Sequence, residues 1–107
     1  MSQDAVEQIK SDVQSNKILI YMKGTPEAPQ CGFSAATVEL FKSLNVPFAT
    51  RDVIADQTLR QHVPAYSHWP TFPQVFIGGQ LVGGCDIIHE MHEHGELEPL
   101  VRKALST

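Results

Sequence analysis

The side chain best suited to chemistry in this sequence is the thiol of Cys31, in the segment Cys31-Gly32-Phe33-Ser34. The apolar spacing that follows predicts a helix starting here, and a cysteine at a helix start lies beside unpaired backbone N–H groups that favour an anion. Lys23, eight residues earlier, adds a cation at the end of a predicted strand. We therefore expect Cys31 to ionise more easily than a free thiol.

The same segment carries Ser34 where a dithiol oxidoreductase has its second cysteine. A serine cannot resolve a mixed disulfide, because that step needs an attacking thiolate. Cys31 must therefore take a second thiol from elsewhere. The other cysteine of the chain, Cys85, lies far along the sequence, which leaves open whether the two sulfurs can meet.

Length and charge narrow the class of protein. The 107 residues suffice for one domain, 1–107, with a core of its own. A net charge of −4 without a basic block argues against nucleic acid as a partner. No apolar run reaches the length of a membrane span, and the N-terminus has neither signal-peptide nor transit-peptide character. We expect a cytoplasmic protein without a membrane partner.

Hydrophobic spacing and turn residues predict nine elements in the order α-β-α-β-α-β-β-α-α. A continuous apolar run suits a central strand buried on both faces, and Pro64 is expected to stop the short helix that Asp56 caps. A βαβ unit followed by a hairpin implies a small mixed sheet with helices on both faces. The predicted strands cover 18–22, 48–53, 74–77 and 80–82, and the predicted helices cover 3–15, 32–44, 57–63, the segment between 84 and 95, and 97–105.

Three separate segments make a recognisable set. They are Lys23-Gly24-Thr25-Pro26 with the Cys31 segment, then Trp69-Pro70-Thr71-Phe72-Pro73-Gln74, then Gly83-Gly84-Cys85-Asp86. Together they resemble the monothiol, CGFS-type glutaredoxins over essentially the whole chain, including the longer loop before the cysteine that separates this class from dithiol glutaredoxins. The resemblance implies an α/β, thioredoxin-like (glutaredoxin) fold with a four-stranded mixed sheet flanked by helices.

The resemblance also implies a glutathione site around Cys31. Lys23 and Arg60 would hold the glycyl carboxylate, and the backbone of Phe72, before a proline that the family holds cis, would bind the cysteinyl part. The helix that Gly84 opens would receive the γ-glutamyl carboxylate. The implied set comprises Lys23, Cys31, Gly32, Phe33, Arg60, Thr71, Phe72, Pro73, Gly84, Cys85 and Asp86, of which Asp86 would take the ammonium group and Cys85 would contribute its backbone N–H.

Two functions follow from this resemblance. A [2Fe–2S] cluster needs four ligands, which two copies of Cys31 and two glutathione thiols supply, so a cluster-bridged homodimer in iron–sulfur cluster assembly, transfer and iron homeostasis is expected. BolA-type proteins and apo iron–sulfur proteins are the implied partners. The alternative is a glutathione-dependent oxidoreductase that removes glutathione from protein thiols with one cysteine. We expect such activity to be low.

Simpler interpretations exist for single residues. A lone cysteine is often inert and buried, Asp86 alone is a helix N-cap, and an exposed Arg60 needs no function. His89, His92 and His94 suggest a metal site, since His89 and His92 can share a helix face, but they lack zincin spacing. The solvated face of a helix is the favoured interpretation of these histidines.

Overall fold

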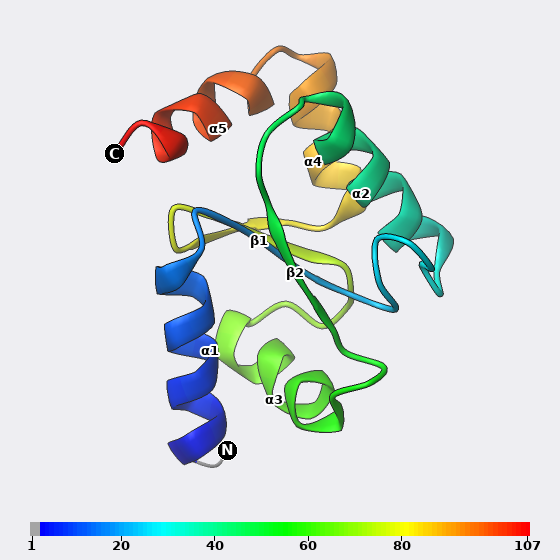
Figure 1. The fold of residues 1–107 in the computed structure, drawn as a ribbon, viewed down its shortest axis with the longest axis vertical. Helices are drawn as coiled ribbons and strands as arrows, with labels where there is room; N and C mark the ends of the chain where they lie inside the picture. The colour runs from blue at the N-terminus through cyan, green and yellow to red at the C-terminus, as the bar shows by residue number, and fades with distance from the viewer. Residues whose placement is uncertain (1–2) are drawn as a thin grey trace.

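The computed structural model describes residues 3–107, and its elements follow the predicted order (Figure 1). They are α1 (Gln3–Ser15), β1 (Ile18–Met22), α2 (Gly32–Ser43), β2 (Ala49–Asp52), α3 (Gln57–Ser67), β3 (Gln74–Ile77), β4 (Gln80–Gly83), α4 (Cys85–Glu93) and α5 (Leu97–Leu105). Among these residues, no helix is long and apolar enough to cross a membrane.

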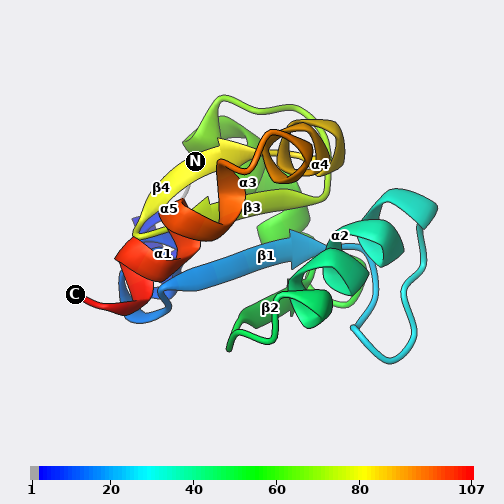
Figure 2. The same cartoon turned by 90° about the horizontal axis from the view of Figure 1, so that it is seen from above.

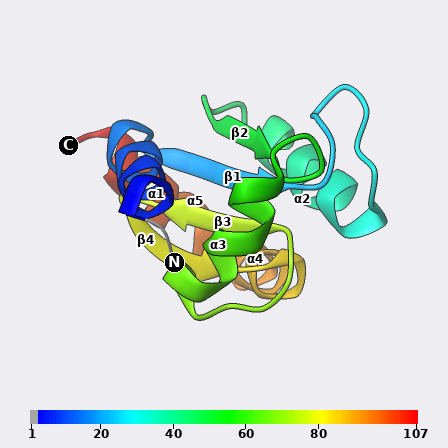
Figure 3. The ribbon, with the colours of Figure 1, turned by 90° about the horizontal axis from the view of Figure 1, so that it is seen from below.

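The four strands form one mixed sheet in the order β2-β1-β3-β4. Strand β1 pairs parallel with β2 and antiparallel with β3, and β3 and β4 form an antiparallel hairpin. Helices α2, α4 and α5 cover one face (Figure 2), and α1 and α3 cover the other (Figure 3). The structure is the thioredoxin-like arrangement that the sequence predicts.

Strand β1 is apolar throughout because both of its faces are covered. Ile18, Ile20 and Met22 belong to the core beneath α2, α4 and α5, whereas Leu19 and Tyr21 belong to the core beneath α1 and α3. Successive side chains of a strand point to opposite faces, so a central strand between two helix layers has no exposed position for a polar residue. This confirms the prediction of a strand buried on both sides.

The turns that connect the later elements are also those that the sequence predicts. Gly78 and Gly79 have φ of 61° and 81°, the left-handed conformation that a two-residue hairpin turn requires. Gly95, with φ of 71°, follows the end of α4, and the N–H of Glu96 donates to the carbonyl of Met91 at 2.8 Å. Helices α4 and α5 are therefore joined by a closed, hydrogen-bonded turn.

The prediction that Pro64 stops the third helix is wrong. Asp56 caps α3 as expected, its carboxylate accepting from the N–H of Leu59 at 3.2 Å, but the helix continues through Pro64 to Ser67. A proline inside a helix removes one backbone donor. One turn beyond Val63, Tyr66 packs against the same core, and its burial favours the extra turn. The helix ends instead at His68, whose φ is 57°. The other bounds differ from prediction by a residue or two at the element ends.

A buried polar network joins α1 to the sheet. The hydroxyl of Tyr21, which is fully buried, donates to the Asp12 carboxylate at 3.2 Å, and the guanidinium of Arg51 lies 3.2 Å from the other oxygen of Asp12. Burial, and next the Asp12 carboxylate, raise the pKa of Tyr21 far above its usual range. The hydroxyl therefore remains a donor, and Asp12 satisfies it.

We expect Asp12→Ala to lower the free energy of unfolding by about 1–3 kcal/mol, because it leaves the Tyr21 hydroxyl buried without an acceptor. Tyr21→Phe removes the donor itself and should have a smaller effect. Urea unfolding followed by circular dichroism measures both, with Lys10→Ala on the exposed face of α1 as the control. Equal stability of Asp12→Ala and the control would contradict this account of the network.

Candidate functional site

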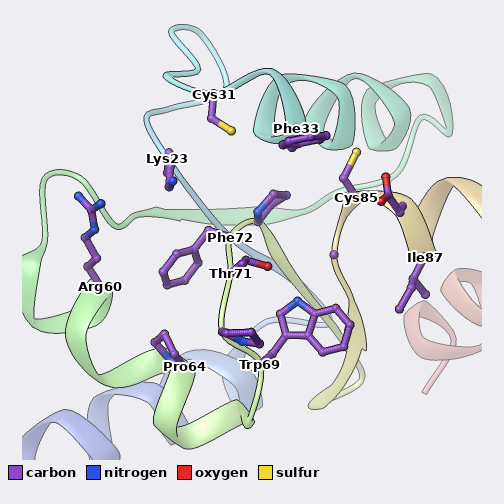
Figure 4. A pocket seen from close by; sticks show the side chains of 14 residues that line it. Lys23, Cys31, Phe33, Arg60, Pro64, Trp69, Thr71, Phe72, Cys85 and Ile87 are labelled. Carbon is purple, nitrogen blue, oxygen red and sulfur yellow. The ribbon is translucent and has the colours of Figure 1, made fainter.

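The site begins where β1 ends and α2 starts. Residues 24–30 form a closed loop, in which the N–H of Ala28 donates to the carbonyl of Thr25 at 3.0 Å and the N–H of Gln30 donates to that of Lys23 at 2.9 Å. The loop thereby returns the chain to the end of β1, and Cys31 stands directly before the first residue of α2. The thiol and the ammonium group of Lys23 consequently face the same hollow (Figure 4).

Gly24 is required for this loop. Its φ is 90°, and a Cβ added there would lie 2.5 Å from the carbonyl oxygen of Ala28. Asp52, at the end of β2, also holds the loop in place at Gly24. Its carboxylate accepts from the N–H groups of Gly24 at 2.9 Å, Ile54 at 2.8 Å and Ala55 at 3.3 Å. Burial alone would raise the pKa of Asp52, but the three donors together lower it below its usual value.

The surroundings of Cys31 favour its thiolate. The backbone N–H of Ser34 makes the largest contribution that lowers the pKa of Cys31, followed by the N–H of Phe33 and the charge of Lys23, and together they outweigh the opposing effect of burial. The sulfur is partly exposed. The expected activation by a helix start and by Lys23 is therefore present, with the helix N–H groups ahead of the lysine.

Ser34 has a structural role that the sequence did not reveal. Its side chain is fully buried, and its hydroxyl accepts a hydrogen bond from the backbone N–H of Lys23 at 3.1 Å. The same hydroxyl makes a smaller contribution to lowering the pKa of Cys31. One atom thus joins the start of α2 to the end of β1.

A cavity of about 600 Å³ opens beside the thiol (Figure 4), a volume within the range typical of small-ligand sites. Its two sides differ in chemistry. Lys23 and Arg60 supply positive charge on one side, whereas the start of α4, with unpaired backbone N–H groups, lies on the other. The lining residues are Lys23, Cys31, Phe33, Arg60, Pro64, Trp69, Pro70, Thr71, Phe72, Pro73, Gly84, Cys85, Asp86 and Ile87.

The segment that crosses the cavity carries a cis Phe72–Pro73 peptide bond, as the resemblance implies. Pro73 is buried, and its carbonyl oxygen would lie 3.2 Å from a Cβ added at Gly84. This segment and the start of α4 are therefore in close contact. Phe72 lines the same cavity as Cys31 and the start of α4.

The structure brings together the site residues that the resemblance implies. All of them except Gly32 line the cavity of Cys31, and Gly32 lines a neighbouring one. Pro64, Trp69, Pro70 and Ile87 line it as well without having been assigned to it. The available signal for Trp69 and Pro70 was their place in the motif of residues 69–74. No sequence signal placed Pro64 in the site, because the sequence predicts that this proline ends a helix.

The second cavity, of about 490 Å³, adjoins the first at the two cysteines and includes Ala36 and His89. The Nδ1 of His89 lies 2.8 Å from the carbonyl oxygen of Cys85, to which it can only donate, and 3.5 Å from the Cys85 sulfur. His92 lines a different hollow. Between residues 3 and 107, no three His, Cys, Asp or Glu side chains are grouped so as to hold a metal ion. Cys31 and Cys85 are both free thiols.

Comparisons with known proteins show the family to which this chain belongs. The Glutaredoxin family model matches residues 18–82. Glutaredoxin 4 of Pasteurella multocida is 49% identical over 92% of this chain and 90% of its own, and mitochondrial monothiol glutaredoxin-S15 of Arabidopsis thaliana is 52% identical over 84% of this chain. The match spans about half, 53%, of the Arabidopsis protein. The solution structure of reduced poplar apo GrxS14 superimposes with a TM-score of 0.83, at 44% identity, over 94% of this chain and 93% of the poplar chain.

The reactivity of Cys31 should have a midpoint at lower pH than that of a free thiol, near 8.5, because the helix N–H groups and Lys23 favour the thiolate. Lys23→Gln should move the midpoint upward, and Lys42→Gln, at the far end of α2, should leave it unchanged. The measurement is the rate of alkylation by iodoacetamide against pH in a Cys85→Ser background. A midpoint equal to that of a free thiol would contradict the activation described here.

Asp52 should make the fold sensitive to acid. Its pKa is lowered in the folded state, so its contribution to stability is present above the unfolded pKa, near 4, and is lost as pH falls through the folded pKa. The drop in melting temperature between pH 6 and pH 3 should therefore be smaller in Asp52→Asn than in the wild type. Glu93→Gln, an exposed carboxylate on α4, is the control. Identical drops in the wild type and Asp52→Asn would refute this role.

Proposed function

Because the chain belongs to the monothiol glutaredoxins, we propose that it binds glutathione beside Cys31 and carries a [2Fe–2S] cluster between two copies of itself. The observation that carries the proposal is a single activated thiol in a cavity with a cationic side and a helix start. Within its motif that thiol has a buried hydroxyl, from Ser34, in place of a partner thiol. Iron–sulfur cluster assembly, transfer and iron homeostasis are the processes that such a carrier serves.

Glutathione suits this cavity because its charges are at its two ends. Its glycyl carboxylate would lie near the Lys23 ammonium and the Arg60 guanidinium. The backbone of Phe72 would hold the cysteinyl part in the manner of an added strand. At the other end, the N–H groups of Gly84 and Cys85 would receive the γ-glutamyl carboxylate, and Asp86 would hold the ammonium group. Thr71 and Phe33 complete the walls.

The ligand count supports a cluster shared by two chains. A [2Fe–2S] cluster takes four ligands, and the lowered pKa of Cys31 suits its thiolate to be one of them. Two copies of Cys31 and two glutathione thiols make four. Because half of these ligands are guests rather than parts of the chain, the cluster can leave together with them. This favours transfer to apo iron–sulfur proteins as its use.

The remaining partners and the setting complete the proposal. A BolA-type protein would replace one copy of the chain in a heterodimeric cluster complex. The net charge of −4, without a basic block, supports a role without nucleic acid. The cytoplasm is the proposed compartment, where free thiols stay reduced. The whole chain, 1–107, is proposed to act as one glutaredoxin domain.

A second candidate function rests on the lowered pKa of Cys31. The thiolate would attack the glutathione sulfur of a protein–glutathione disulfide, break the disulfide bond and release the protein thiol after protonation. A second glutathione thiolate would then attack the Cys31-bound glutathione sulfur, which frees Cys31 and yields glutathione disulfide. One cysteine suffices for this cycle. The closed loop at residues 24–30 is expected to favour a glutathione pose that ligates iron, so this activity should be low.

Anaerobic reconstitution with iron, sulfide and glutathione tests the cluster proposal. We expect the visible absorption of a [2Fe–2S] centre on a dimer-sized species, and none when glutathione is omitted. Cys31→Ser should lose this absorption completely while keeping its circular dichroism spectrum. Cys85→Ser should retain it, since only the backbone of that residue is invoked.

Two outcomes would count against this assignment. A Cys31→Ser protein that still holds the cluster would contradict the proposal that Cys31 is a ligand. Absence of a cluster in the wild type, together with rapid removal of glutathione from a model disulfide, would favour the oxidoreductase instead.

A further inference from the structure

The indole of Trp69 is the least satisfied group of the cavity. Its Nε1–H is buried and has no hydrogen-bond partner. A buried donor without a partner costs about 1–3 kcal/mol, and such groups are rare enough in native proteins that each one needs a physical reason. Trp69 lines the cavity of Cys31, so the reason is to be sought in what the cavity binds.

The backbone of Trp69 is hydrogen-bonded on both sides. The N–H of Trp69 donates to the hydroxyl of Ser67 at 3.2 Å and to the carbonyl of Pro64 at 3.3 Å. Its carbonyl accepts from the side-chain amide of Gln74 at 2.8 Å, and Gln74 is fully buried. The backbone of Trp69 is therefore held in the loop by hydrogen bonds on both sides of its side chain.

The indole N–H lies beside the start of α4. A Cβ added at Gly84 would lie 3.5 Å from Nε1, so the space that a side chain would occupy at that position is within reach of the indole. Gly84 is the N-cap of α4, whose first N–H groups also lack helical partners. The donor of Trp69 thus lies beside the residue that caps α4, and the free N–H groups of the helix start favour an acceptor with negative charge.

The start of α4, beside Trp69, is separate from the cationic side of the cavity. Figure 4 shows Trp69 on the side of Cys85 and Ile87, with Lys23 and Arg60 across from it. Under the proposed function, on which this step rests, glutathione has one carboxylate for each side. We propose that the Trp69 indole N–H donates to the γ-glutamyl carboxylate of glutathione at the start of α4, which makes Trp69 a binding residue of this site. Because Nε1 is buried in the free chain, this hydrogen bond requires the ring to move and admit the carboxylate oxygen.

The test uses the fact that the chain has one tryptophan. A ¹⁵N-labelled, reduced sample gives a single indole N–H resonance, which can be followed while glutathione is added. We expect this resonance to move downfield and to saturate with the same Kd as the backbone signals of the cavity. Cysteinylglycine, which lacks the γ-glutamyl group, should move backbone signals near Lys23 and leave the indole resonance in place.

Two variants separate the two ends of the ligand. Trp69→Phe keeps an aromatic ring without the donor and should weaken glutathione binding about tenfold, as expected for a hydrogen bond to a charged group. Its affinity for cysteinylglycine should equal that of the wild type. Lys23→Gln is the matched control, because it should weaken both ligands, which share the glycyl carboxylate. Circular dichroism melting checks that each variant folds.

The outcomes distinguish this inference from the function on which it rests. An indole resonance that stays in place while glutathione saturates the backbone signals would overturn the inference alone, as would equal glutathione affinity of Trp69→Phe and the wild type. No glutathione binding by the wild-type chain would overturn the proposed function and the inference with it. If Trp69→Phe does not fold, the wild-type resonance decides by itself.

Discussion

The thiol site depends on the burial of β1 between two helix layers. All five residues of the strand are at most 1% exposed, with alternate side chains in the two cores. A strand held from both sides cannot slide along its axis without moving its apolar set out of register. Its C-terminal end is therefore a fixed point, and Lys23 stands there. The hydrogen-bonded loop and the Ser34 hydroxyl then tie the start of α2 to the same point, so the position of Cys31 follows from the core.

The replacement of a second cysteine by Ser34 changes more than the redox chemistry. A hydroxyl accepts the Lys23 N–H, and unlike a thiol it cannot be oxidised to a disulfide that would consume Cys31. Because the residue is fully buried, it needs that hydrogen bond. The site thus keeps one nucleophilic sulfur at the helix start and uses the second position to hold the two elements together. Because Cys31 cannot form a disulfide within its own motif, its thiol remains free to act as a ligand.

The sequence predicts the fold well because its signals are local and strong. The uniform apolar run of β1, the two glycines of the hairpin and the glycine after α4 each have one structural use. Pro64 misled the prediction, because the packing of Tyr66 against a distant core outweighs a local helix breaker. Most of the residues that line the cavity belong to motifs that are visible in the sequence. The Asp12–Tyr21–Arg51 network, the buried role of Ser34 and the contact of Trp69 with Gly84 were not predicted, because each joins residues whose proximity depends on tertiary packing.

The geometry of the cavity sets the length of ligand that it can hold. Its cationic side includes the end of β1, and its other side is the start of α4, which directly follows β4. Strands β1 and β4 flank β3 in the sheet, so the two sides are held apart by the strand order and not by mobile side chains. A ligand with one carboxylate can pair with the donors of one side only. A ligand with a carboxylate at each end, and a thiol between them, can satisfy both sides while its sulfur lies beside Cys31. For the proposed ligand, selectivity would therefore come from the sheet that separates the two sides as much as from any residue that touches it.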